Sequence, residues 1–154
     1  MAENSPLIRL AGTDPSDTRP RVPFAADVLD FLADLSKELR GTPDARHMGD
    51  VQTFAFWCRR ANLDRLRTAH DDGTRRLGRG LAFHGAPANV PINFAFSLAF
   101  GLLAGCANIV RVPSAPHAVV DLVAGVVDKV LARHPHLAAS NTLVRYDAAS
   151  AHSA

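Results

Sequence analysis

The sequence predicts an α/β fold, in which N-terminal helices are followed by part of a doubly wound parallel sheet. From Gly80 onward, short apolar runs alternate with longer helical patterns in the order strand, helix, strand, helix, strand. This alternation is typical of parallel strands joined by right-handed crossovers. Before Gly80, apolar residues recur only at helical spacing. The hydrophobic fraction of 47%, against 21% charged residues, is enough for a buried core.

The pattern divides the 154 residues into four parts. Residues 1–22 are rich in Pro, Asp, Ser and Thr, and we expect a flexible arm there. Residues 23–79 are predicted to be a helical segment. Residues 80–146 are predicted to be a partial dinucleotide-binding domain, and residues 147–154 a tail of small residues.

Two helices are expected in the helical segment. The first lies between Pro23 and Gly41, because apolar residues there share one face. The second is expected from about Asp50, its predicted N-cap, to about Thr68. The polar, glycine-bearing stretch that follows, residues 70–80, indicates a loop.

The predicted sheet begins with a short apolar strand at residues 80–84, which we expect to be buried. A proline-rich turn at residues 87–91 leads into a helix over residues 92–104, apolar on nearly every side and ended by Gly105. Prolines and asparagines within the uncharged stretch 81–110 would leave polar groups unsatisfied in lipid, so we predict no membrane span.

The second and third strands are predicted at residues 108–112 and 142–146. Ser114 is expected to cap the helix between them, which stops before Pro135. Parallel sheets bind ligands at the carboxyl ends of their strands. The turns at residues 85–91 and 113–116 are therefore the predicted site.

Charge and cysteine content exclude several classes of function. A net charge of +2 gives little support for binding nucleic acid. Cys58 and Cys106 lack the spacing of a zinc site or a disulfide framework. Because the first ten residues do not read as a secretory leader, a cytoplasmic location is expected.

Three stretches resemble the acyl-CoA reductases that supply fatty aldehyde in bacterial luminescence, together with their relatives. They are FAFWCRRANL at 54–63, GRGLAFHGAPANVP at 78–91, and FSLAFGLLAG with NIVRVPS at 96–105 and 108–114. The resemblance covers roughly Phe24 to Tyr146, and it implies the N-terminal part of an aldehyde-dehydrogenase-like cofactor domain. It further implies reduction of a fatty acyl thioester to an aldehyde with NADPH.

The turn around Asn89 is similar to the Pro-Trp-Asn-Phe-Pro turn of the aldehyde dehydrogenase superfamily. The resemblance implies that the Asn89 amide supports an oxyanion, a task that needs a neutral donor of fixed direction. It also implies that Ala86 and Pro87 lie beside the cofactor. The alternative is that Asn89 only caps the following helix.

Arg111 stands where the superfamily carries a lysine that contacts the adenosine ribose. Arginine there suits a 2′-phosphate, and Ser114 falls near a glutamate of NAD-preferring relatives, so the resemblance implies NADPH. The local spacing differs by one residue from the superfamily pattern. The alternative for Arg111 is a solvated arginine at a strand end.

The superfamily's nucleophilic cysteine lies beyond Ala154, so neither Cys58 nor Cys106 matches it and both are expected to be structural. We expect no reductase activity from this chain alone. The implied partners are a fatty acyl-CoA or acyl-enzyme donor, and either a missing catalytic half or a second copy. The alternatives are a non-catalytic dinucleotide-binding module, half of a split reductase, or an inactive truncated product with uncovered apolar surface.

Other polar residues have simpler interpretations. His84 is expected to be a core histidine bonded to backbone, with a proton donor as the alternative. The arginines between positions 59 and 79 are expected to form a solvated face, although they could attract the phosphates of coenzyme A or NADP. Phe54, Phe56 and Trp57 indicate packing.

Overall fold

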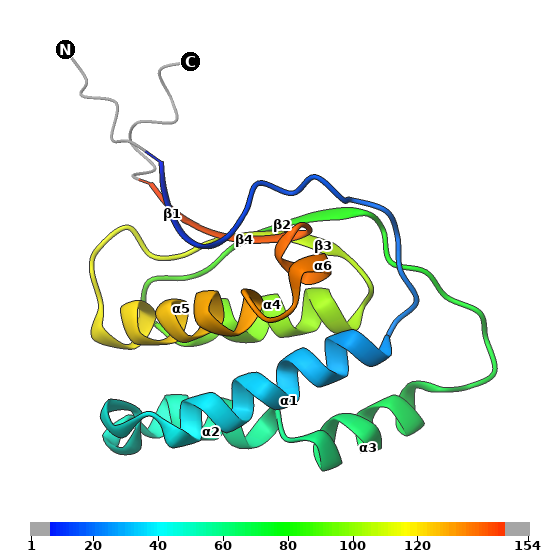
Figure 1. Ribbon diagram of the computed structural model, residues 1–154, viewed down its shortest axis with the longest axis horizontal. Coiled ribbons are helices and arrows are strands. Elements are labelled where there is room, and N and C mark those ends of the chain that lie inside the picture. The colour runs from blue at the N-terminus through cyan, green and yellow to red at the C-terminus, as the bar shows by residue number, and fades with distance from the viewer. Residues whose placement is uncertain (1–6, 147–154) are drawn as a thin grey trace.

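The computed structural model describes residues 7–146, and the predicted tail at 147–154 lies outside them (Figure 1). One sheet holds four strands in the order β1-β4-β3-β2. Helices α4 and α5 cover one face of the sheet, and α1, α2 and α3 form a further layer beyond them (Figure 1). The predicted α/β class is confirmed.

The parallel part of the sheet follows the predicted order. Strands β2 (Leu81–Gly85), β3 (Ala107–Arg111) and β4 (Asn141–Arg145) run parallel. Helices α4 (Asn93–Leu103) and α5 (Ala118–Leu131) connect them. Since each crossover moves one strand along the sheet in the same direction, right-handed connections put both helices on the same face.

The segment predicted as a flexible arm is ordered from residue 7 onward, and this prediction is wrong there. Strand β1 (Ile8–Gly12) pairs antiparallel with β4 and makes the sheet mixed. The following residues run along the amino ends of the strands, where Ser16 N–H donates to Ala139 O at 2.9 Å and Arg21 N–H donates to Gly105 O at 3.0 Å. Main-chain hydrogen bonds hold this segment in place, although its sequence has no apolar periodicity that would predict a regular element.

The helical segment differs from prediction in one respect. Helix α1 (Ala26–Gly41) is as expected, and a 3-10 helix, η1 (Pro43–His47), follows it. The single helix predicted next is two, α2 (Gly49–Trp57) and α3 (Arg60–His70), because Arg59 is extended. The Asn62 amide donates to Trp57 O at 2.8 Å across the break. Met48, rather than Asp50, is the N-cap of α2.

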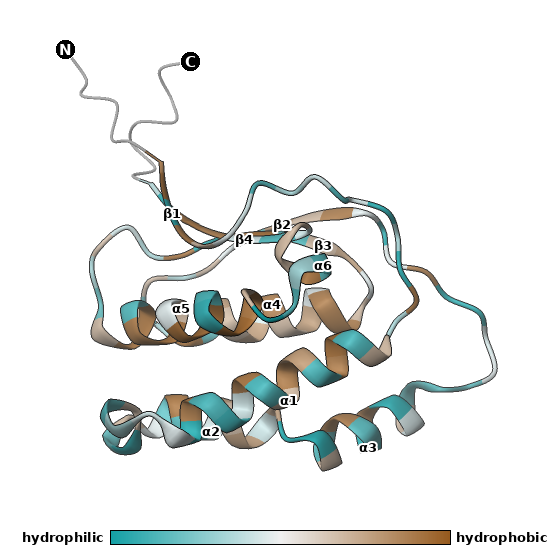
Figure 2. Ribbon diagram, viewed as in Figure 1, coloured by the Kyte–Doolittle hydropathy of each residue, from teal (hydrophilic) through white to brown (hydrophobic). Residues whose placement is uncertain are grey.

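The exposure of each helix and strand agrees with its position in the layers of the fold. Figure 2 shows α4 as mostly hydrophobic and α3 as mostly hydrophilic, in agreement with α4's position between the sheet and the outer helices. Strand β2 was expected to be buried, and this is wrong: Leu81 is 49% exposed and Phe83 60% exposed. They point away from α4 on an edge strand. No helix among residues 7–146 has the length and apolar character needed to cross a membrane.

Two glycines let α4 sit close to its surroundings. A Cβ at Gly101 would overlap Asn108 Oδ1, so only glycine allows the helix to approach β3 here. Gly105, at φ +84°, ends the helix. Its N–H donates to Leu102 O, and Cys106 N–H donates to Gly101 O, both at 3.0 Å, which is a Schellman motif.

The short helix α6 (Pro135–Ala138) separates α5 from β4. Helix α5 ends at Leu131, before Pro135 as predicted. Its N-cap is His117, whose Nδ1 accepts from Val119 N–H at 3.2 Å. The prediction that Ser114 caps this helix is therefore wrong.

Candidate functional site

The carboxyl ends of β2 and β3 meet at one edge of the sheet. Gly85 is paired with Arg111 in the parallel register, and Ala86 N–H donates to Arg111 O at 3.0 Å. The turn that carries Pro87 and Asn89 therefore starts beside Arg111. Ala86 itself is 7% exposed, so its main chain, rather than its side chain, is what the turn contributes.

Asn89 lies exposed in the turn between β2 and α4. The N-cap of α4 is Ile92, without a side-chain cap, so the alternative that Asn89 caps this helix is wrong. Asn93 N–H donates to Val90 O at 3.0 Å and closes the turn through main chain instead. The Asn89 amide has no hydrogen-bond partner within residues 7–146, which leaves both its donor and its acceptor available.

Arg111 and Ser114 lie together at the end of β3. Arg111 Nη2 donates to Ser114 Oγ at 2.9 Å and to Tyr146 O at 3.4 Å, and Ser114 Oγ donates to Tyr146 O at 3.0 Å. The guanidinium carbon lies 4.9 Å from the centre of the Tyr146 ring. Arg111 Nε is buried and has no hydrogen-bond partner among the described residues.

Arg111 is a half-buried cation, and an anionic ligand can pair with the accessible part of such a group. Arg111 also has no carboxylate within 4.0 Å in the described part of the chain. The cluster thus offers positive charge at the edge where parallel sheets bind ligands. Tyr146 was missed from sequence, since only the register of β4 against β3 brings it here.

The two cysteines occupy different environments. Cys58 is fully buried, and burial raises the pKa of its thiol well above the ordinary range. Such a thiol is inert as a nucleophile. Cys106 is half-buried just past the C-terminal end of α4, while Asn89 precedes the other end. An eleven-residue helix spans about 16 Å, so Cys106 is far from the Asn89 amide.

His84 is held by a side chain, and the predicted backbone bond is wrong. Its Nε2 lies 2.9 Å from Asn108 Oδ1. The Asn108 amide nitrogen already donates to Cys106 O at 2.9 Å and to Asn141 Oδ1 at 2.8 Å. Asn108 Oδ1 is therefore the acceptor and His84 Nε2 the donor.

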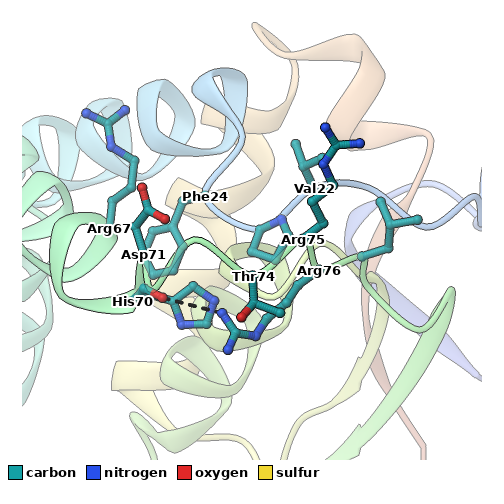
Figure 3. A pocket seen from close by; sticks show the side chains of 10 residues that line it. Val22, Phe24, Arg67, His70, Asp71, Thr74, Arg75 and Arg76 are labelled. Carbon is teal, nitrogen blue, oxygen red and sulfur yellow. Dashed lines mark hydrogen bonds between the residues drawn. The ribbon is translucent and has the colours of Figure 1, made fainter.

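Two large cavities lie elsewhere, and Asn89, Pro87 and Arg111 line neither of them. The first, about 780 Å³, lies between the chain before α1 and the loop after α3 (Figure 3). The second, about 620 Å³, lies beside the C-terminal end of α4. Both fall within the roughly 300–1,000 Å³ typical of ligand pockets. Residues 7–146 hold no cluster of three or more potential metal ligands.

Comparison with protein families gives a match over most of the chain. The family model described as Acyl-CoA reductase (LuxC) matches residues 46–151, more than half of the chain. The matched region contains the Asn89 turn, Arg111 and Ser114. No curated protein and no solved structure matches the chain.

Proposed function

Since this chain belongs to the acyl-CoA reductase (LuxC) family, we propose that it forms the NADPH-binding part of an enzyme that reduces fatty acyl thioesters to aldehydes. The observation that supports this most directly is the Arg111 cluster. A guanidinium with no carboxylate oxygen within 4.0 Å among residues 7–146 stands at the carboxyl ends of parallel strands, beside the Asn89 turn.

Arg111 and Ser114 would hold the 2′-phosphate of NADPH. The guanidinium supplies the charge, and Ser114 and Tyr146 fix its direction through the contacts described above. A serine near the ribose also avoids the repulsion that a carboxylate would exert on a phosphate. The main chain of Ala86 and Pro87 borders the same edge. When bound, NADPH supplies the hydride, while the protein contributes binding and orientation.

Asn89 would support the oxyanion that forms when a thiolate attacks the thioester carbonyl. Its amide is neutral, and it lies in a turn bounded by Pro87 and Pro91. A donor held in a fixed direction needs no reorganisation as negative charge develops. Removal of one such donor typically lowers the rate constant of the chemical step by about 100- to 1,000-fold.

The nucleophile would come from outside these residues. Cys58 is buried with a raised pKa, and Cys106 follows the end of α4 opposite to Asn89, a helix about 16 Å long. This favours a second candidate function, a dinucleotide-binding module or one half of a split reductase. In either case the 154-residue chain binds NADPH but forms no aldehyde by itself.

Titration of the 154-residue chain with NADPH and NADH by calorimetry tests the proposal. We expect saturable NADPH binding, and Arg111→Gln should weaken it about 10- to 100-fold, because a charged hydrogen bond contributes about 1.5–3 kcal/mol. NADH binding should change little.

Arg46→Gln, at an exposed arginine of η1, is the matched control and should leave both affinities unchanged. Equal losses for NADH and NADPH in Arg111→Gln would contradict the assigned role of Arg111. Aldehyde formation by the isolated chain with acyl-CoA and NADPH would contradict the assignment of the nucleophile to another part.

A further inference from the structure

The sheet has two outer strands, and they differ in how well their free edges are protected. Strands β1 and β2 stand at the two ends of the strand order, so each has a single neighbouring strand within residues 7–146. Soluble proteins protect such edges with charged residues, prolines or bulges. Strand β1 carries Arg9 and a break in register between Arg9 and Ala11. Strand β2 has neither device: its sequence, LAFHG, contains no Lys, Arg, Asp, Glu or Pro, and its register with β3 is unbroken.

The side chains of β2 that face away from α4 are apolar and exposed. Gly101 of α4 lies against His84, because a Cβ at Gly101 would come within 3.0 Å of His84 Nε2. Side chains alternate along a strand, so Leu81, Phe83 and Gly85 face the other way, where α4 and α5 do not cover the sheet (Figure 1). Leu81 is 49% exposed and Phe83 60% exposed. Two large apolar side chains therefore lie directly beside the unprotected edge.

The main chain of the same three residues faces this edge. Ala107 N–H donates to Gly80 O at 2.9 Å, and Ala86 N–H donates to Arg111 O at 3.0 Å. The even-numbered residues of β2 thus turn their main chain toward β3, and the odd-numbered residues turn theirs outward. No turn, loop or cap hydrogen bond within residues 7–146 uses the outward groups. The edge therefore offers three N–H donors and three C=O acceptors.

We propose that this edge pairs with the same edge of a second copy of the chain, antiparallel, with a two-fold axis at Phe83. Phe83 then lies opposite the partner's Phe83, and Leu81 lies opposite the partner's Gly85. Opposed residues whose main chains face each other exchange both hydrogen bonds in an antiparallel pair. Every outward N–H group of each copy thereby meets a C=O group. The two sheets become one continuous sheet, with four strands from each copy.

Shifting the axis along β2 loses part of this pairing. An axis one residue earlier would set Gly85 against the partner's Arg79, which lies beyond the left-handed Gly80 at φ +88°. An axis one residue later would set Leu81 against the partner's Pro87, which has no N–H to donate. Either shift leaves outward groups of the edge unpaired, so the hydrogen bonds favour the axis at Phe83.

The side chains suit the same register. Gly85 has no heavy atom within 4 Å of the place where a Cβ would stand, so the partner's Leu81 has room above it. The two Phe83 rings become neighbours, and cross-strand aromatic pairs stabilise a sheet. Arg79, four residues before the axis, would lie about 26 Å from the partner's Arg79, too far for strong repulsion. The edge is thus complementary to itself in hydrogen bonding, size and charge, as a two-fold dimer requires.

Sedimentation of the 154-residue chain over about 1–100 µM tests the proposal. Two five-residue strands form a small interface, so we expect a reversible dimer of twice the 16.5 kDa chain mass. Phe83→Glu sets two carboxylates directly opposite each other and should weaken dimerisation at least about tenfold. Gly85→Val fills the space for the partner's Leu81 and should also weaken it. Phe56→Glu, at a phenylalanine of α2 that is 58% exposed, is the matched control and should leave dimerisation unchanged.

Cysteine substitutions test the register. In the proposed pairing the Cα atoms of the two Phe83 residues are about 5.5 Å apart, which is within the range of a disulfide. In a chain whose half-buried Cys106 is replaced by serine, Phe83→Cys should therefore give a covalent dimer on mild oxidation. Leu81→Cys, at another exposed residue of the same strand, is the control. Its two copies would lie about 13 Å apart, too far to form a disulfide.

A chain that stays monomeric at every concentration overturns the proposal. Dimerisation of Phe83→Glu equal to that of the wild-type chain overturns it as well, and so does open-ended assembly, because two-fold pairing uses the single β2 edge of each copy. Cross-linking of Leu81→Cys as fast as that of Phe83→Cys overturns the proposed axis. Circular dichroism checks the fold of each variant, and Gly85→Val and the cysteine pair decide the outcome if Phe83→Glu does not fold. The dimer does not depend on NADPH, so its test is independent of the proposed NADPH site.

Discussion

Individual asparagines organise the inside of the sheet. Asn108 is fully buried, and its amide joins three strands: it accepts from His84 of β2 and donates to Asn141 of β4. Asn141 in turn donates to Leu137 O at 2.8 Å. A buried polar network with all its partners present favours one strand register over others. The space for this network is created by Gly101 of α4.

Gly101→Ala should destabilise the protein by about 1–3 kcal/mol, because the added methyl group overlaps Asn108 Oδ1 and forces α4 or the amide to move. Urea unfolding followed by circular dichroism measures the change. Gly125→Ala, in α5 with open space around its Cα, is the control and should stabilise by up to about 1 kcal/mol. Equal effects of the two substitutions would show that the network does not depend on the close approach.

At the scale of elements, the end of α4 fixes the path of the chain around it. The Schellman motif at Gly105 turns its carbonyl toward Arg21 N–H, and Arg21 O accepts from Gly78 N–H at 2.8 Å. Three segments distant in sequence are thereby joined through main chain. One residue in a left-handed conformation therefore supports both the start of β3 and the chain beside the two large cavities.

Gly105→Ala should cost about 2–4 kcal/mol, the sum of the left-handed strain of an L-residue and of overlap with Arg21 O. Gly73→Ala has a similar positive φ but nothing within 4 Å, so it should cost only the strain, about 1–2 kcal/mol. Thermal unfolding of both variants measures the difference. Equal losses of melting temperature in the two variants would show that overlap with Arg21 O adds nothing to the cost of Gly105→Ala.

The sequence predicted the elements whose cause is local. Apolar periodicity indicated α1, α4 and α5, and short apolar runs indicated the three parallel strands to within one residue. Strand β1 was missed because its order comes from pairing with β4, more than a hundred residues later. The break between α2 and α3 was missed because neither Cys58 nor Arg59 is a proline or a glycine, the residues that usually mark the end of a helix. The exposure of β2 depends on its place at the sheet edge.

In the candidate site, the sequence predicted the main-chain arrangement but not the side-chain contacts. Adjacent ends of parallel strands bring the main chain of Ala86 to Arg111, as topology alone implies. The contact of Arg111 with Ser114 and Tyr146 needs side-chain geometry. The resemblance placed Arg111 and Ser114 in one site, while the apolar pattern made Ser114 a helix cap, which is wrong. The roles of Ala86, Pro87, Arg111 and Ser114 toward a bound cofactor stay predictions, as does the role of Asn89 toward an oxyanion.

For the whole molecule, the outer helices are tied to the sheet layer by charge as well as by apolar packing. Glu38 of α1 pairs with Lys129 of α5, and with Arg133 at 3.4 Å. The hydrogen bond from Lys129 lowers the pKa of Glu38 below its usual value of 4.5. A carboxylate with a lowered pKa stabilises the folded state above its unfolded pKa, and this contribution is lost as the pH falls through the folded pKa.

Glu38→Gln should therefore lower the stability at pH 7, and its difference from the wild-type chain should shrink as the pH falls below 4.5. Urea unfolding at pH 7, 5 and 3 measures this. Asp44→Asn, at an exposed carboxylate of η1, is the control and should show little difference at any of these pH values. A Glu38→Gln deficit that is constant with pH would mean that the side chain acts through packing, not through its charge.

The antiparallel pairing of Ile8 with Arg145 brings the two ends of the described chain to neighbouring strands at one edge of the sheet (Figure 1). Neighbouring strands lie about 5 Å apart. A short peptide linking residue 7 to residue 146 would therefore close the backbone into a ring. New termini opened in the loop between α3 and β2 would give a circular permutant whose sheet order is unchanged.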